Sequence, residues 1–280
     1  MQLNKARVVI YGLGLMGGSL AIALQGNCAK ITAVDPDEKT RGMAIAHHIV
    51  EKALPYPPEH PLESDLIILA APTITNINIL QNLSTYQTGN AVVLDLSSTK
   101  SVISSVMETL PSQFDPIGGH PMCGKESYSL ENADPAIYRG ATFALSPLLR
   151  TSPAARSLAA EIVEIVGSEL LWIDAKTHDR LVAFSSHLPY LVSNALAATV
   201  PAESAILVGT GFISTSRLAV SNQSMILDVL ETNRENILSA LHSYQENLAE
   251  LEKLLSTESF QELGIHLQKG AEQRQILVGK

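Results

Sequence analysis

The chain has 280 residues, a formal net charge of −9 at pH 7 and 46% hydrophobic residues. This length predicts two domains, and the acidic balance excludes nucleic acid and anionic membrane surfaces as expected partners, which leaves a small molecule. Two cysteines exclude a disulfide framework, and without a signal-peptide pattern we expect a cytoplasmic protein. The eight histidines form no metal-ligand motif and no apolar run reaches bilayer length, so we expect neither a metal nor a membrane.

The first half of the chain alternates short β-branched runs with helical stretches, which predicts a parallel sheet with crossover helices. Turn residues such as those at Asp35-Pro36-Asp37 separate these segments. The expected strands are Arg7–Tyr11, Ile31–Asp35, Leu66–Ala70, Ala91–Leu94, Phe114–Gly118, Ala141–Leu145 and Glu169–Trp172, and the expected helices are 17–25, 37–47, 74–83, 100–109 and 154–166.

After Trp172 helical periodicity replaces the strand-like runs, so we expect residues 1–173 to bind a dinucleotide and residues 174–280 to form a helical substrate and dimerisation domain. Asp174 is suited to cap a helix that breaks near Pro201. A long helix is expected through Leu227 to Leu255. Its apolar stripe indicates packing against a partner helix, either within the chain or in a second subunit of a homodimer.

A glycine-rich turn follows the first expected strand and opens the first expected helix. Gly12, Gly14 and Gly17 have the GxGxxG spacing, which permits a tight turn, close approach of a pyrophosphate and close helix–strand packing. The free N–H groups of a helix N-terminus favour phosphate. The fold class is therefore α/β: an N-terminal Rossmann-type dinucleotide-binding domain followed by an all-helical C-terminal domain. The loop residues Leu13, Leu15 and Met16 are expected to line the cofactor.

The end of the second expected strand carries residues that could select the cofactor. Asp35 is suited to accept the ribose hydroxyls of NAD, although it could instead cap the next helix. Lys39, Thr40 and Arg41 follow, and an arginine there can hold the 2′-phosphate of NADP. The charge of Asp35 disfavours a 2′-phosphate whereas the cations that follow favour one, so the choice between NAD and NADP stays open. The remaining cofactor candidates, after the third and fourth expected strands, are Ala71, Pro72 and Ser97.

Further polar segments follow the fourth and fifth expected strands, where ligands bind in an open α/β sheet. They are Asp95-Leu96-Ser97-Ser98-Thr99-Lys100 and Gly118-Gly119-His120-Pro121-Met122-Cys123-Gly124. The helical half adds Ser186-His187-Leu188-Pro189-Tyr190, Gly209-Thr210-Gly211-Phe212 and Ser214-Thr215-Ser216-Arg217-Leu218-Ala219. Together, in this order and spacing, these segments resemble the prephenate/arogenate dehydrogenase family over almost the whole chain, and most of all its short single-function arogenate dehydrogenases.

The resemblance implies oxidative decarboxylation of arogenate to tyrosine, with NADP as the cofactor. It implies that His120 is the general base, that Ser98 hydrogen-bonds the base or the substrate hydroxyl, and that Arg217 binds a substrate carboxylate. Ser98 could equally cap the helix beginning near Lys100. The resemblance also places Glu126 near the pocket mouth, and adds the substrate-side candidates His187, Tyr190 and Met225.

Two positions depart from the family pattern. Tyr190 stands where members commonly have a second histidine, and Ile226 stands where they commonly have tryptophan. Three alternatives stay open at this point: a prephenate dehydrogenase using NAD, a β-hydroxyacid-type dehydrogenase with the same glycine turn, and a non-catalytic dinucleotide-sensing regulator.

Overall fold

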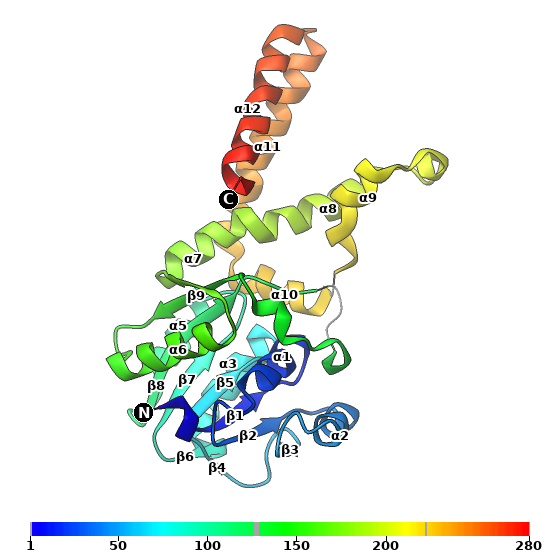
Figure 1. Cartoon of the computed structure of the whole chain (residues 1–280). Helices are drawn as coiled ribbons and strands as arrows, with labels where there is room; N and C mark the ends of the chain where they lie inside the picture. Colours follow the sequence, from blue (N-terminus) through cyan, green and yellow to red (C-terminus); the bar gives the residue numbers. More distant parts are fainter. Residues whose placement is uncertain (1, 126–128, 222, 280) are drawn as a thin grey trace. The chain divides into compact units, whose positions relative to one another are not determined.

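The computed structural model describes residues 2–125, 129–221 and 223–279, and within them eight strands form one sheet in the order β10-β9-β8-β7-β5-β1-β2-β3 (Figure 1). Strand order reverses beside β1, because β2 and β3 lie on one side of it and β5, β7 and β8 on the other. These strands are β1 Arg7–Tyr11, β2 Lys30–Val34, β3 Lys52–Leu54, β5 Leu66–Leu69, β7 Ala91–Asp95, β8 Phe114–Pro121, β9 Thr142–Pro147 and β10 Glu169–Trp172.

The expected parallel sheet contains one antiparallel pairing, that of β8 with β9. Between these strands the described residues contain only the short turns η2 (Leu130–Asn132) and η3 (Pro135–Tyr138). A parallel return needs a crossover, usually a helix. Since this connection has none, β9 starts at the edge where β8 ends, next to Pro121.

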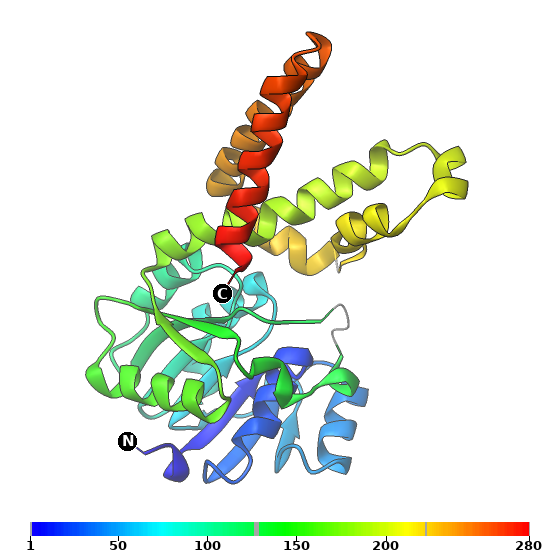
Figure 2. The ribbon, with the colours of Figure 1, turned by 45° about the horizontal axis from the view of Figure 1, so that its top comes forward.

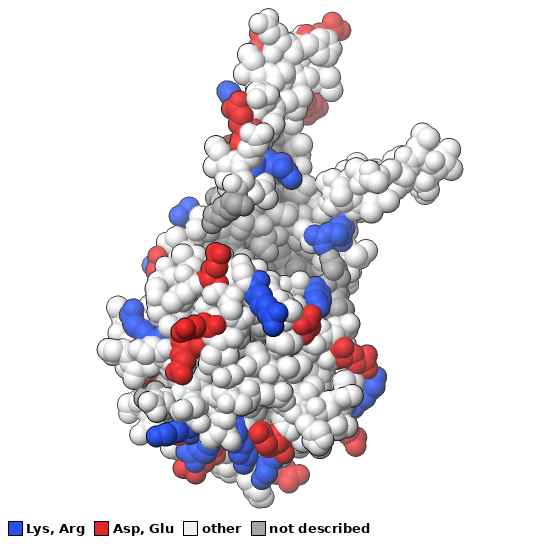
Figure 3. Space-filling model, in the orientation of Figure 1, with Lys and Arg blue, Asp and Glu red and all other residues white. Residues whose placement is uncertain are grey.

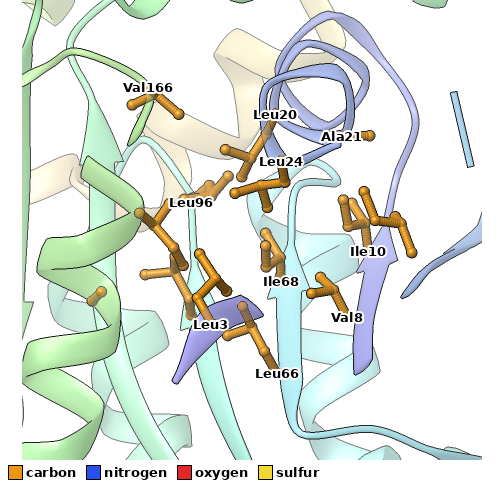
Figure 4. Close-up of a cluster of buried hydrophobic side chains, with 14 of the residues drawn as sticks. Leu3, Val8, Ile10, Leu20, Ala21, Leu24, Leu66, Ile68, Leu96 and Val166 are labelled. Carbon is orange, nitrogen blue, oxygen red and sulfur yellow. The ribbon is translucent and has the colours of Figure 1, made fainter. Parts of the chain in front are cut away.

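Two hydrophobic cores cover the two faces of the sheet, because successive strand residues point to opposite sides. Val8 and Ile10 pack with α1 and α6, whereas Val9 and Tyr11 pack with α3 and α5 (Figures 1, 2 and 4). The helices of this part are α1 Leu15–Leu24, α2 Glu38–Ala46, α3 Thr73–Gln81, α4 Leu83–Tyr86, α5 Ser101–Glu108 and α6 Pro153–Ile165, preceded by the turn η1 Leu3–Lys5.

All seven expected strands and five expected helices are confirmed to within a few residues. Three strands were not expected: β3, and the small pair β4 (Leu62–Glu63) and β6 (Gln87–Thr88). Runs of two or three residues are too short to show a period of two, so the sequence carries no pattern for them.

The helical half begins with one continuous segment made of α7 (Ala175–Val182), the π-helical turn η4 (Ala183–His187) and α8 (Leu188–Thr199). Asp174 caps it, accepting the Thr177 N–H at 2.9 Å. The π-turn ends at His187, two residues before Pro189, which has no N–H to donate to the preceding turn. Short elements follow: η5 Ala202–Leu207, α9 Thr210–Ser216 and η6 Arg217–Val220.

The expectation that no apolar run reaches bilayer length is wrong for this segment. Residues Ala175–Thr199 are long and apolar enough to cross a membrane by length and composition, with a mean hydropathy of 1.2. A core helix passes the same test, and here His178 and Asp179 are buried in contact with the sheet-bearing part.

The expected long helix through Leu227 to Leu255 is divided. α10 (Gln223–Thr232) ends before Asn233 and α11 (Arg234–Ser256) begins after it. The buried Asn233 side chain donates to the Asp179 carbonyl at 2.8 Å, which holds this junction against α7. The hydrophobic periodicity of the sequence does not predict this contact.

The chain divides into two compact units, Met1–Arg234 and Glu235–Lys280. The second contains α11 and α12 (Phe260–Val278), side by side in both views (Figures 1 and 2), and α12 was not expected from the sequence. Ile237 is buried, but Leu248 and Leu255 of the predicted stripe are exposed within the chain. The predicted domain boundary after residue 173 stays a prediction.

Candidate active site

The glycine turn lies where strand order reverses, between the carboxyl ends of β1 and β5, which is where ligands bind in such sheets. Gly12 has a φ of +94°, and a Cβ there would lie 2.8 Å from the Ala71 nitrogen. A Cβ on Gly17 would lie 1.9 Å from the Gly12 carbonyl oxygen. Among the described residues no side chain caps α1 at Gly14. The backbone N–H groups of its first turn therefore fit a pyrophosphate.

Asp35 faces this turn from the end of β2. Its Oδ2 accepts the Leu13 N–H at 2.7 Å, and its Oδ1 accepts the Asp37 N–H at 2.9 Å. The alternative that Asp35 caps the next helix is wrong, because Asp37 caps α2 by accepting the Thr40 N–H at 2.7 Å.

The two cations expected near the cofactor make other contacts. Arg41 donates from Nη1 to the carbonyl oxygens of Asp35 and Pro36, at 2.8 and 2.7 Å. Lys39 is exposed and pairs with Glu131 at 2.8 Å. On the face of the molecule in Figure 3, basic and acidic side chains are interspersed and form no continuous basic patch.

The residues after β5 and β7 are held together by one asparagine. Asn76 Nδ2 donates to the Ala71 carbonyl at 2.9 Å and to Ser97 Oγ at 3.0 Å. Ser97 Oγ in turn donates to Asp95 Oδ1 at 2.6 Å, and Pro72 is the N-cap residue that precedes α3. Buried Asn76 thus fixes two neighbouring strand ends at the edge where the glycine turn lies.

A fully buried ion pair lies beneath the histidine segment. Lys100 Nζ donates to Asp95 Oδ2 and to the Gly119 carbonyl, the latter at 2.6 Å, and both charged side chains are 0% exposed. The lysine stem passes Gly118, where a Cβ would lie 3.3 Å from Lys100 Cδ. Gly118 therefore gives the lysine stem room, whereas a Cβ on Gly119 would lie 3.0 Å from Phe143 Cε1 and 3.1 Å from the Asp95 carbonyl oxygen.

His120 is the next-to-last residue of β8, and its ring meets a second histidine from α7. His120 Nδ1 lies 2.9 Å from His178 Nε2, with the ring planes inclined at 65°. His178 Nδ1 lies 2.8 Å from Asp179 Oδ1. His120 is partly exposed, whereas His178 and Asp179 are buried. The structure therefore joins an imidazole at the sheet edge to a buried carboxylate through one intervening ring.

Asp179 also binds the start of α5. Its two oxygens accept the N–H groups of Lys100 and Ser101, each at 2.7 Å. The alternative that Ser98 caps this helix is therefore wrong, because a carboxylate from α7 takes that place. Within the described residues, Ser98 is partly exposed and its side chain makes no hydrogen bond.

Packing controls the protonation of these groups. The protein atoms around His120 lower its pKa well below 6.5 by desolvation, and the nearby His178, Lys100 and His187 lower it further. Burial opposes ionisation of Asp179, but the hydrogen bonds from His178 and from two backbone N–H groups outweigh it and lower that pKa. His120 is thus neutral and Asp179 ionised at neutral pH.

The remaining predicted residues lie on the helical elements. His187 is buried in η4, its Nδ1 3.2 Å from Asn233 Nδ2, and burial lowers its pKa to about 4. Tyr190 is partly exposed on α8, Arg217 is exposed on η6, which packs against α8, and Met225 is partly exposed on α10. Glu126 lies outside the described residues.

His178, Asp179 and Asn76 were missed from the sequence. The first two belong to a polar run at a helix start, which is typical of an exposed first turn, and the third belongs to a helix with no motif. The described residues contain no group of three or more His, Cys, Asp or Glu side chains that could hold a metal.

A Rossmann-type sheet, an uncapped helix start at its switch point and a neutral imidazole at the same edge define a dehydrogenase that uses a nicotinamide dinucleotide. The family model "Prephenate dehydrogenase, nucleotide-binding domain" matches residues 20–171, and "Prephenate dehydrogenase, dimerization domain" matches residues 174–269. The chain belongs to the prephenate dehydrogenase family. It is an enzyme that acts on cyclohexadienyl substrates, so the β-hydroxyacid-type and non-catalytic alternatives are wrong.

The similarity to known proteins covers nearly the whole of this chain. The prephenate dehydrogenase of Lactococcus lactis is 25% identical, over 97% of this chain and 77% of the relative. The crystal structure of prephenate dehydrogenase from Aquifex aeolicus, in complex with hydroxyphenyl propionate and NAD+, is 27% identical with a TM-score of 0.86, covering 99% of this chain and 98% of that one. The Synechocystis arogenate dehydrogenase structure is 26% identical with a TM-score of 0.81, covering 97% and 100%.

Proposed function

We propose that the protein converts arogenate to tyrosine by oxidative decarboxylation, with His120 as the general base. The observation that carries this proposal is a neutral, partly exposed imidazole at the carboxyl edge of the sheet, the same edge at which the glycine turn lies. The base removes the proton of the ring hydroxyl while hydride leaves the same carbon. The electrons of the breaking carboxylate bond then complete the aromatic ring as CO2 departs. A bound nicotinamide supplies the hydride acceptor.

The side chain of the substrate supports arogenate over prephenate. Arogenate carries an ammonium and a carboxylate there, with no net charge, whereas prephenate carries a carboxylate and a ketone. Tyr190 offers a phenol where family members commonly have histidine, so this chain has one cationic candidate fewer for the prephenate tail.

One assay tests the substrate and the reaction. The protein is incubated with arogenate or prephenate and with NAD or NADP, and reduced cofactor is followed by its near-ultraviolet absorbance. We expect the highest kcat/KM with arogenate. A higher value with prephenate would favour the alternative, and no turnover in any of the four pairings would contradict the proposed function.

For the cofactor we infer NAD, although the family resemblance favoured NADP. Asp35 lies against Leu13 of the glycine turn, where its carboxylate can accept ribose hydroxyls and would repel a 2′-phosphate. The cations that could offset this repulsion are turned to other partners, Arg41 to backbone carbonyls and Lys39 to Glu131.

The Asp35→Asn variant tests this inference. We expect the ratio of kcat/KM for NADP to that for NAD to rise about tenfold or more, because the substitution removes the repelling charge and keeps an acceptor oxygen. Asp37→Asn is the matched control, since it removes the same charge two residues away and asparagine still caps α2. A wild-type protein that prefers NADP would contradict the inference.

Arg217 is proposed to bind a substrate carboxylate through its two-pronged guanidinium, which lysine cannot reproduce. We expect Arg217→Lys to raise the KM for the substrate about tenfold or more with a smaller effect on kcat. Arg180→Lys, at an exposed position of α7, is the control. A KM within about twofold of wild type would contradict this role.

We also propose a homodimer through the helical half, which the second family model describes as a dimerization domain. α12 has no buried residue, and its apolar side chains Phe260, Ile265 and Leu267 are more than half exposed. A second subunit would cover such a surface. Light scattering at micromolar concentration should give twice the chain mass, and a monomer would contradict the proposal.

A further inference from the structure

Resting on the proposed function of His120, we propose that His178 and Asp179 are positioning residues that fix which nitrogen of His120 carries the proton. They would keep Nδ1 protonated and leave Nε2 free to accept the proton of the substrate. The same contacts make this arrangement depend on the docking of α7 against the start of α5.

The argument begins at the carboxylate. An ionised carboxylate only accepts hydrogen bonds, so the His178 nitrogen facing Asp179, Nδ1 at 2.8 Å, must carry a proton. Our proposal assigns His178 a single ring proton, which leaves its Nε2 as an acceptor. His120 Nδ1 lies 2.9 Å from that nitrogen and must therefore donate to it. His120 Nε2 is then the unprotonated nitrogen.

The position of Asp179 explains why it stays ionised in a buried place. Backbone N–H groups of Lys100 and Ser101 donate to its two oxygens, each at 2.7 Å, at the positively polarised end of α5. These donors come from the sheet-bearing part, whereas Asp179 belongs to α7. A carboxylate that left α5 would lose both bonds, and the constraint on His178 would weaken with it.

The surroundings of His120 offer no competing partner for Nδ1 among the described residues. The titratable and charged groups near its ring are His178 and His187 from the α7–η4 segment and Lys100 from the start of α5. Lys100 Nζ is turned to Asp95 and to the Gly119 carbonyl, and His187 Nδ1 faces Asn233. Of the residues that the structure describes, only His178 is hydrogen-bonded to the ring of His120.

His178→Phe tests the role, because phenylalanine keeps a flat ring and removes both hydrogen bonds. We expect kcat to fall about 10- to 100-fold with KM little changed, the order of loss seen when the outer partner of a metal-bound histidine is removed. His178→Gln should retain more activity, since its amide oxygen can still accept from His120 Nδ1.

A spectroscopic readout separates positioning from mere stability. In protein with ¹⁵N-labelled histidine, the His120 signals are those lost in His120→Asn, and we expect a protonated Nδ1 and an unprotonated Nε2. In His178→Phe this preference should weaken. Should that variant not fold, Asp179→Asn replaces it, because an amide no longer requires a proton on His178 Nδ1, so the preference of His120 for a protonated Nδ1 should weaken.

Thr232→Val is the control, as it removes the buried 2.7 Å contact between Thr232 and Thr99 without touching the histidines. It should leave the His120 tautomer unchanged. An unaltered tautomer and an unaltered kcat in His178→Phe would overturn the inference. If the wild-type protein turns over neither substrate, the proposed function fails, but the tautomer comparison needs no substrate and still decides this inference.

Discussion

In the His120→Asn variant, kcat should fall about 10²- to 10⁴-fold, because this is the usual contribution of a positioned general base. Asparagine can still accept a hydrogen bond but cannot take up a proton, so substrate binding and the KM should change little. The measurement is steady-state kinetics with the preferred substrate and cofactor. His60→Asn, at an exposed position, is the control and should keep kcat within about twofold.

The pH dependence gives this prediction a second test. Because desolvation and the neighbouring His178, Lys100 and His187 lower the pKa of His120, its neutral form persists to pH values well below 6.5. We therefore expect kcat/KM to be flat near neutral pH and to fall only under acidic conditions as His120 gains a proton. A kcat in His120→Asn equal to that of the wild type would refute the assignment.

The core of the fold could be predicted because its signals are local. β1, β2, β5 and β7 are short apolar runs bounded by turns, and the intervening helices have clear starts. β8 runs three residues further than expected, through His120 to Pro121, because pairing with β9 extends it. The division between α10 and α11 depends on the contact of Asn233 with α7, which no periodicity records.

In the candidate site, too, the residues with a local sequence signal could be predicted and those that depend on long-range contacts could not. His120, the glycine turn and Asp35 follow strand ends in a motif, so their edge of the sheet could be predicted. His178 reaches His120 across 58 residues, and Asp179 reaches Lys100 across 79. Such long-range contacts are set by the docking of α7 on the sheet-bearing part, and a single sequence does not encode them as a spacing.

Lys100 gives the prediction with the largest effect on stability. Lys100→Met should lower the free energy of unfolding by about 3–5 kcal/mol, because it leaves the Asp95 carboxylate buried without its counter-charge. It also removes the donor to the Gly119 carbonyl, next to the proposed base. Urea denaturation at fixed protein concentration measures the change.

Lys39→Met is the matched control, since it breaks an exposed ion pair with Glu131 and should change stability little. Adding Asp95→Asn to Lys100→Met should recover part of the loss, because the amide removes the uncompensated charge and still accepts from Ser97. If Lys100→Met were no more costly than Lys39→Met, the buried pair would not stabilise the fold. If the double variant were as unstable as Lys100→Met alone, the loss would lie in the Gly119 contact rather than in the unpaired charge.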